Sequence, residues 1–147
     1  MENRHESPWV ISQKRVPYGH TDKMGHVYYG HALLYFEMGR TEWMREGGMT
    51  YRQFEEDGLF VPVVEAYVRY RGRIFYDDLI EISTSATSVG RTRYKFFYEM
   101  RRAGEEKVLY EGNTVHGIVD SNGRPKRVPP MFIEMLERLG ENKSEKS

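Results

Sequence analysis

In residues 91–102, mostly apolar side chains alternate with mostly charged ones. This alternation constrains the fold more than any other feature of the sequence. The less polar positions are Thr92, Tyr94, Phe96, Tyr98 and Met100. Because successive side chains of a strand point to opposite faces, the segment predicts a half-buried β-strand. Three further runs, rich in Val, Ile, Tyr, Ser and Thr, predict strands over residues 61–70, 79–88 and 108–119.

The segment before these strands has the composition of helices. Residues 30–46 predict one long helix, which two consecutive glycines then end. Gly39 in its middle costs about 1 kcal/mol relative to Ala, so we expect another element to pack closely against it. Thr50 is a favoured N-cap residue and predicts a short helix that ends near Gly58. The remaining predicted elements are a first strand over residues 9–18 and a last helix over residues 130–139.

The order of these elements predicts the fold class. Short connections, such as residues 102–106, favour antiparallel pairing of the strands. We therefore expect an α+β domain with one long helix on an antiparallel sheet, and this helix is apolar enough to lie inside a strongly curved sheet. The pattern alone fits cystatin-like folds and cone-shaped α+β barrels equally well. With 147 residues, 39% of them apolar, we expect one domain over residues 1–139 and a polar, disordered tail over residues 140–147.

Composition excludes several classes of function. The chain has no cysteine, which rules out disulfides, thiolate metal ligands and a cysteine nucleophile. Its 22 basic residues balance 22 acidic ones, so the overall basic charge typical of nucleic-acid binding is absent. No apolar run is long enough to span a bilayer, and the first residues are too polar for a secretory signal. We expect a soluble, cytoplasmic protein.

Charge is nevertheless segregated along the chain. Residues 37–57 carry a net charge of −3, and residues 91–102 carry +4. A second basic cluster comprises Arg124, Lys126 and Arg127. This distribution suggests a small anionic ligand, although the solvated faces of a helix and a strand explain it equally well.

The segment between the first strand and the long helix, residues 18–31, carries most of the candidate chemistry. It contains Asp22 and three histidines, His20, His26 and His31, which could supply a base or nucleophile and its partners. The adjacent helix start offers unpaired backbone N–H donors and the positive end of the helix dipole, which suit a developing oxyanion.

Plainer interpretations of these residues are open at this stage. Asp22 could be an ordinary turn residue whose carboxylate accepts hydrogen bonds from nearby backbone N–H groups. The spacing of the three histidines fits no standard metal site, so we expect no metal. His116 lies within a predicted strand, and we expect it to be a core or interface residue rather than a ligand.

Four stretches carry a resemblance to a known family. The first two read Val16-x-Tyr18-x-x-Thr21-Asp22-x-x-Gly25-x-Val27-Tyr28 and Tyr35-Phe36-Glu37-x-x-Arg40-Thr41-Glu42-Trp43-Met44-Arg45. The others read Tyr76-Asp77-Asp78-Leu79 and Val119-Asp120-x-x-Gly123-Arg124-Pro125-x-Arg127-x-Pro129. Together they resemble the hotdog-fold acyl-CoA thioesterases over most of residues 15–130. The similarity is to the 4-hydroxybenzoyl-CoA thioesterase-like group, which includes the Tol–Pal-associated thioesterases.

This resemblance implies a hotdog fold, homodimers or homotetramers, and active sites at an interface where two sheets join edge to edge. It implies that Asp22 acts as nucleophile or general base, and that the Tyr29 N–H polarises the thioester carbonyl. The neighbouring residues expected to contact the substrate are Gly25, Val27, Tyr28 and Gly30. No cofactor is expected, because coenzyme A enters as part of an acyl-CoA substrate, and acyl-carrier-protein thioesters are a further option.

Coenzyme A carries phosphate groups, which arginine matches in geometry and charge. The arginines that could bind them are Arg91, Arg93, Arg124 and Arg127.

The chain also departs from the family pattern. His26 stands where relatives usually have Val or Ile, so it could assist catalysis or lie at the pocket rim. Phe75-Tyr76 replaces the common Pro-Ala pair near the substrate. These departures concern the substrate more than the reaction. Two alternatives are open: a hotdog hydratase or dehydratase, since Asp22 and His26 are four residues apart, and a non-catalytic acyl-CoA-binding or scaffold module.

Overall fold

The computed structural model describes residues 9–146, and the side chains as far as Leu139. Five antiparallel strands form one sheet in the order β1-β3-β4-β5-β2. The strands are β1 (Val10–Arg15), β2 (Val63–Tyr70), β3 (Leu79–Val89), β4 (Arg93–Arg102) and β5 (Val108–Gly117). The helices are α1 (Ala32–Glu46), α2 (Tyr51–Glu56) and α3 (Pro130–Lys146), with short 3₁₀ turns η1 (Tyr18–His20) and η2 (Tyr29–His31).

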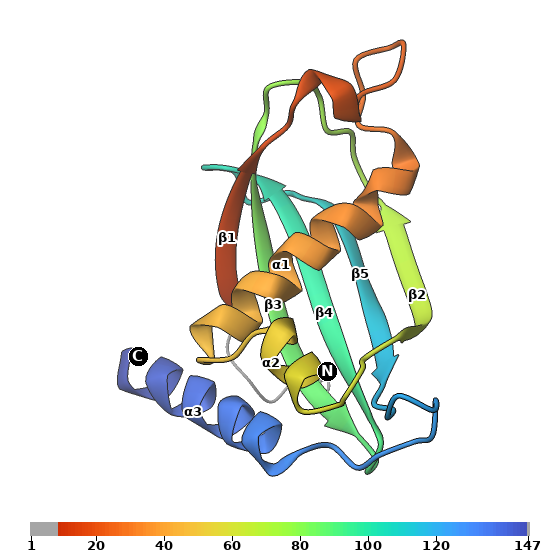
Figure 1. The fold of residues 1–147 in the computed structure, drawn as a ribbon. Helices are drawn as coiled ribbons and strands as arrows, with labels where there is room; N and C mark the ends of the chain where they lie inside the picture. The colour runs from red at the N-terminus through yellow and green to blue at the C-terminus, as the bar shows by residue number, and fades with distance from the viewer. Residues whose placement is uncertain (1–8, 147) are drawn as a thin grey trace.

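Helix α1 crosses one face of the sheet, and α2 and α3 lie near its C-terminal end (Figure 1). Phe36 of α1 stacks on Tyr98 of β4 with ring centroids 4.1 Å apart, and Trp43 packs edge-on to Phe96. These aromatic rings are completely or almost completely buried. A predicted α+β domain with one long helix on an antiparallel sheet is therefore confirmed, and its core lies between α1 and the sheet.

The buried face predicted for β4 is confirmed, although Phe97 on the opposite face is also buried and Thr92 lies in the turn before the strand. Tyr94, Phe96, Tyr98 and Met100 are each at most 1% exposed, since they face α1. The close packing expected at Gly39 is also present, because a methyl group there would lie 2.4 Å from Thr84 Oγ1 and 2.7 Å from Ile82 Cγ2 on β3. The missing side chain of one glycine therefore sets the distance between the helix and the sheet.

The ends of several elements differ from the predicted ones for local reasons. The strand predicted over residues 9–18 ends at Arg15, because the chain turns into η1 after Pro17. Strand β2 begins at Val63 rather than residue 61, because Pro62 has no N–H to donate. Strand β4 begins at Arg93, since Gly90 with a φ of +67° starts a turn.

The start of the long helix and the end of the last helix also differ from the predicted positions. A 3₁₀ turn, η2, precedes the predicted long helix, and the α-helix itself begins at Ala32. Helix α3 continues to Lys146, beyond the predicted end at residue 139. Residues 1–8 and 147 lie outside the described residues, and the disordered tail over residues 140–147 and the domain boundary stay predictions.

A buried polar network joins β4, β5 and the segment before β2. The hydroxyls of Tyr98 and Thr114 lie 2.6 Å apart, and Thr114 Oγ1 lies 2.9 Å from His116 Nε2. His116 Nδ1 lies 3.2 Å from the Val61 carbonyl oxygen. Burial lowers the pKa of His116 to about 4, so this side chain is neutral near pH 7. His116 is therefore the core histidine that the sequence predicted.

Among the described residues, β1 and β2 form the two edges of the sheet. All residues of β2 except the half-buried Val68 are exposed. Between residues 9 and 146 no helix is long and apolar enough to cross a membrane.

Candidate active site

Residues 20–28 form a tight hairpin that projects beyond the start of α1 (Figure 1, orange). Thr21 and Val27 form an antiparallel bridge, and the Tyr28 N–H donates to the His20 carbonyl at 2.9 Å. Gly25 makes the reversal possible, because its φ of +81° lies in the left-handed region that glycine tolerates. Asp22 therefore lies at the tip of a hydrogen-bonded hairpin, next to the helix start.

The carboxylate of Asp22 closes this hairpin. Its Oδ1 accepts hydrogen bonds from the Met24 N–H at 2.9 Å and the His26 N–H at 3.1 Å. The turn role that the sequence left open is thus confirmed. Within the described part of the chain, Oδ2 accepts no hydrogen bond, and Asp22 is exposed. One oxygen fixes the carboxylate in place, while the other is available for chemistry.

The helix start presents two unused donors. The first N–H groups of a helix have no acceptor within it. Among the described residues, the N–H groups of Tyr29 and Gly30 donate to no other group either. A substrate carbonyl placed here would receive these hydrogen bonds at the positive end of the α1 dipole.

A second loop, residues 73–78, holds the hairpin against the sheet. The Val27 N–H donates to the Ile74 carbonyl at 2.8 Å, and the Tyr76 N–H donates to the Gly25 carbonyl at 3.1 Å. This loop is anchored in turn by Asp78, whose Oδ2 accepts from Arg102 at 3.0 Å. The hairpin is therefore bonded to this loop at two points, and the loop is bonded to the end of β4.

Two tyrosines of neighbouring strands lie beside the hairpin and the start of α1, and together these parts form one corner of the molecule. Tyr70 at the end of β2 pairs in register with Tyr110 of β5, and their rings meet edge-on at 4.8 Å. Burial, with smaller contributions from Tyr70 and the negative charge of Asp22, raises the pKa of Tyr110 to about 12. The pair lies at the start of α1, since the Tyr70 hydroxyl donates to the Tyr29 carbonyl at 2.6 Å.

The three histidines of the segment do not converge on a single point. The ring of His26 packs edge-on against Phe75 at 4.9 Å, which places it beside the supporting loop. His20 Nδ1 lies 2.7 Å from the Tyr35 hydroxyl, and its ring is 4.9 Å from that of His31. Burial and the neighbouring His31 lower the pKa of His20. In the part of the chain that the structure describes, no three His, Asp or Glu side chains form a potential metal site.

The other predicted site residues fall into two groups. Gly25, Tyr28 and Gly30 surround the hairpin and helix start, whereas the Val27 side chain is buried in the core at 4% exposure. Tyr28 and Tyr29 are 47% and 66% exposed, so the corner has an open aromatic surface. Their contact with a substrate stays a prediction.

The four predicted arginines lie at the other end of the sheet from Asp22. Arg91 lies in the turn that joins β3 to β4, and Arg93 is the first residue of β4. The segment with Arg124 and Arg127 is held beside this turn, since the Val128 N–H donates to the Arg91 carbonyl at 2.7 Å. All four arginines are exposed and gather into one basic end. Seven residues of β4 separate this end from the level of Tyr70 and Tyr110, or about 23 Å.

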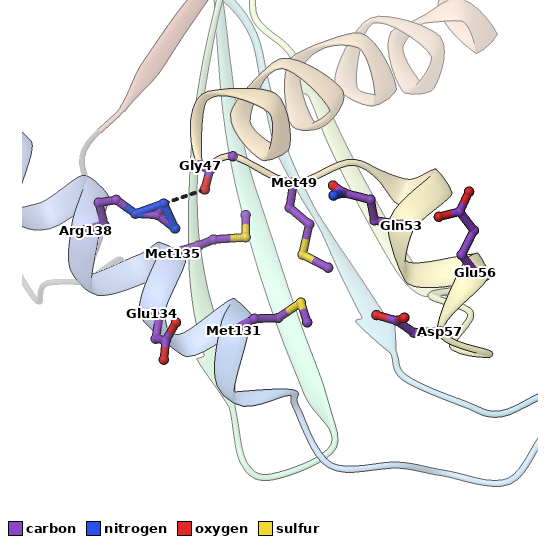
Figure 2. Close-up of a pocket in the computed structure, with 10 residues that line it drawn as sticks. Gly47, Met49, Gln53, Glu56, Asp57, Met131, Glu134, Met135 and Arg138 are labelled. Atoms are coloured by element: carbon purple, nitrogen blue, oxygen red, sulfur yellow. Dashed lines mark hydrogen bonds between the residues drawn. The ribbon is translucent and has the colours of Figure 1, made fainter.

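A pocket of about 280 Å³ lies between the end of α1, α2 and α3 (Figure 2). Its lining includes three methionines and three acidic residues, which are Met49, Met131, Met135, Glu56, Asp57 and Glu134. Arg138 crosses the pocket edge and donates to the Gly47 carbonyl at 2.8 Å. The pocket lies at the opposite end of α1 from Asp22 and shares no residue with the hairpin.

Sequence reasoning missed Tyr70 and Tyr110. Both belong to predicted strands, but their position at the helix start depends on the register between β2 and β5. No local signal in the sequence shows this register.

Comparison with known proteins places these features in a family. Residues 16–137 match the family model described as the thioesterase-like superfamily. An acyl-CoA thioester hydrolase of Escherichia coli, YbgC, is 28% identical over 120 residues, which cover 81% of this chain and 89% of that protein.

Two solved structures have the same fold. A hypothetical protein from Aquifex aeolicus is 31% identical, with a TM-score of 0.80 over 86% of this chain and 98% of its own. A DHNA-CoA thioesterase from Staphylococcus aureus is 25% identical, with a TM-score of 0.83 over 95% of both chains. The fold is the hotdog fold, and the chain belongs to the thioesterase-like superfamily.

Proposed function

We propose that this protein hydrolyses acyl-CoA thioesters, or thioesters of an acyl carrier protein, to a free acid and a thiol. The observation that carries the proposal is that the exposed Asp22, with one carboxylate oxygen unused among the described residues, lies in a hairpin that leads directly into a helix start where the N–H groups of Tyr29 and Gly30 are also unused. Relatives named as acyl-CoA thioester hydrolases support the same reaction. The narrower assignment to a Tol–Pal-associated group stays a prediction.

The chemistry needs few groups. As a nucleophile, Asp22 Oδ2 attacks the thioester carbon and expels the thiolate, and water then cleaves the resulting mixed anhydride. As a general base, it removes a proton from water, which attacks the same carbon and expels the thiolate. In both routes negative charge develops on the carbonyl oxygen, where two backbone donors would stabilise it by about 3–4 kcal/mol. No resident cofactor is required, since coenzyme A is part of the substrate.

We further propose that the working site needs two copies of the chain. The free edge of β2 is exposed along its length and ends at Tyr70 beside the candidate site. Two such edges related by a twofold axis pair antiparallel, which brings the Tyr70 end of one copy beside the Val63 end of the other. Val63 pairs with His116, and the residue that follows His116 in β5 pairs with Arg93. The Val63 end of β2 therefore lies at the same end of the sheet as Arg93.

This pairing would bring the basic end of one copy beside the Asp22 hairpin of the other. The arginines, about 23 Å away within one chain, would then be close enough to hold the phosphates of a coenzyme A whose thioester lies at the helix start. The distance within one chain between the Asp22 hairpin and the four arginines therefore supports a homodimer or homotetramer.

The test is Asp22→Asn, assayed on a panel of aliphatic and aromatic acyl-CoA substrates. Asparagine retains Oδ1, so it can still accept from the N–H groups of Met24 and His26 and keep the hairpin closed. We expect turnover to fall by roughly 100-fold or more with an unchanged melting temperature. Asp57→Asn, which changes an exposed carboxylate at the end of α2, is the matched control.

Three outcomes would contradict the proposal. Unchanged hydrolysis by Asp22→Asn would remove this residue from the chemistry. Faster hydration of enoyl-CoA than hydrolysis of acyl-CoA would favour a hydratase with Asp22 and His26. Tight binding of acyl-CoA by the wild type without turnover at any chain length would favour a binding module.

A further inference from the structure

We propose that Tyr70 is a positioning residue that holds the peptide unit of the oxyanion donors at the start of α1. This inference rests on the proposed thioester hydrolysis and assigns a role to a residue that the sequence did not single out. Tyr70 is the last residue of the edge strand β2, far from the hairpin in sequence, and reaches the helix start through its side chain.

The contact is a short hydrogen bond to the backbone. The Tyr70 hydroxyl donates to the Tyr29 carbonyl oxygen at 2.6 Å. The same oxygen also accepts from the Ala32 N–H, which closes the 3₁₀ turn η2. A carbonyl oxygen has two lone pairs, so both acceptor positions of Tyr29 are used.

This carbonyl belongs to the peptide unit whose N–H is that of Gly30. Hydrogen bonds polarise one another along a chain, so a donor on the carbonyl strengthens the N–H of the same peptide as a donor. The bond also restrains Tyr29, whose own N–H is the other unused donor at this corner. Tyr70 therefore acts on both donors through the backbone of Tyr29.

The surroundings keep Tyr70 in the donating state. Its ring packs edge-on against Tyr110, at a centroid distance of 4.8 Å, which limits rotation of the side chain. Partial burial of the hydroxyl end and the neighbouring Tyr29 raise the pKa of Tyr70, so the hydroxyl stays protonated through neutral pH. Gly30 adds no restraint of its own, because glycine is the most flexible residue in the backbone. An external restraint is therefore useful at this peptide.

The experiment compares Tyr70→Phe with Tyr67→Phe, a matched change of an exposed tyrosine on the same strand. Phenylalanine keeps the ring contact with Tyr110 and removes only the hydroxyl. Losing a direct oxyanion donor lowers kcat about 100- to 1,000-fold, and for an indirect effect we expect about tenfold. The KM for acyl-CoA should change less than about threefold, because ground-state binding is retained. Tyr67→Phe should behave as the wild type.

A second readout separates positioning from general loosening of the fold. In an Asp22→Asn background that holds an uncleaved acyl-CoA, the infrared carbonyl stretch of the bound thioester reports its polarisation. Adding Tyr70→Phe should move this band to higher frequency, towards its value in free acyl-CoA. Adding Tyr67→Phe should leave the band in place.

The outcomes distinguish the two proposals. A wild type that hydrolyses no thioester refutes the proposed function. A wild type that hydrolyses acyl-CoA, with Tyr70→Phe at equal kcat or with an unmoved carbonyl band, refutes the role of Tyr70 alone. A loss of activity caused only by a raised KM, or matched by Tyr67→Phe, would also overturn it.

Discussion

Gly39→Ala tests whether the close approach of α1 to the sheet sets the packing of the core. The added Cβ would lie 2.4 Å from Thr84 Oγ1 and 2.7 Å from Ile82 Cγ2. Ordinary contacts of this kind exceed about 3.4 Å, so the helix or the strand must shift by roughly 1 Å. Both neighbours are β-branched and buried at 1% exposure or less, which leaves them little freedom to rotate away.

Two opposing effects give the expected magnitude. Overpacking a buried site costs about 1–3 kcal/mol, whereas Ala in a helix is about 1 kcal/mol more favourable than Gly. The difference is about 0–2 kcal/mol, so we expect a net loss of about 1 kcal/mol, which lowers the melting temperature by roughly 2–4 °C for a chain of this size. Thermal and urea unfolding measure this loss of stability. Both are done at one protein concentration, because association of copies would otherwise change the apparent stability.

The control is Gly19→Ala, where an added Cβ meets no atom within 4 Å. It should change the free energy of unfolding by less than about 0.5 kcal/mol. Thr84→Ala combined with Gly39→Ala should recover part of the loss, since it removes the nearer of the two clashes. A Gly39→Ala variant as stable as the wild type, or more stable, would refute the packing argument.

Two further predictions concern stability. His116 is neutral in the fold with a pKa of about 4, so only the unfolded chain gains its proton between pH 6.5 and 4. The wild type should therefore lose about 3 kcal/mol more than His116→Gln as the pH falls from 7 to 4, and parallel urea-unfolding profiles would contradict this. Arg102→Ala leaves Asp78 without its charged partner, with the Phe75 N–H still donating to the carboxylate, and should cost about 2 kcal/mol, against less than about 0.5 kcal/mol for the exposed Arg52→Ala. Equal effects in urea unfolding would refute the anchoring role of Arg102.

The sequence predicted the features that depend on local patterns. The two-residue period of 91–102 gave a strand with the correct buried face, and the glycine within 30–46 marked a close helix–sheet contact. Asp22 was a candidate because a carboxylate between a strand and a helix start can either accept hydrogen bonds within a turn or act as a nucleophile or base. The structure shows that its two oxygens allow both roles at once.

Features that depend on pairing between distant strands could not be predicted. Tyr70 reaches the helix start only because the register of β2 and β5 places it beside Tyr110. The arginines were predicted to bind substrate with Asp22, but whether they share its end of the sheet depends on strand direction and length. Their separation within one chain became visible only in the folded structure, and it led to the proposal of a site formed by two copies.

Complementation between two inactive variants tests this central claim most directly. One partner carries Asp22→Asn, and the other carries Arg124→Ala and Arg127→Ala, so each homodimer lacks one half of every site. If a site combines the hairpin of one copy with the basic end of the other, a mixed dimer contains one intact site. Random reassociation of equal amounts should then restore about a quarter of the wild-type kcat/KM for acyl-CoA. If the mixture stays as inactive as its parents while mixed dimers form, the two-copy site is contradicted.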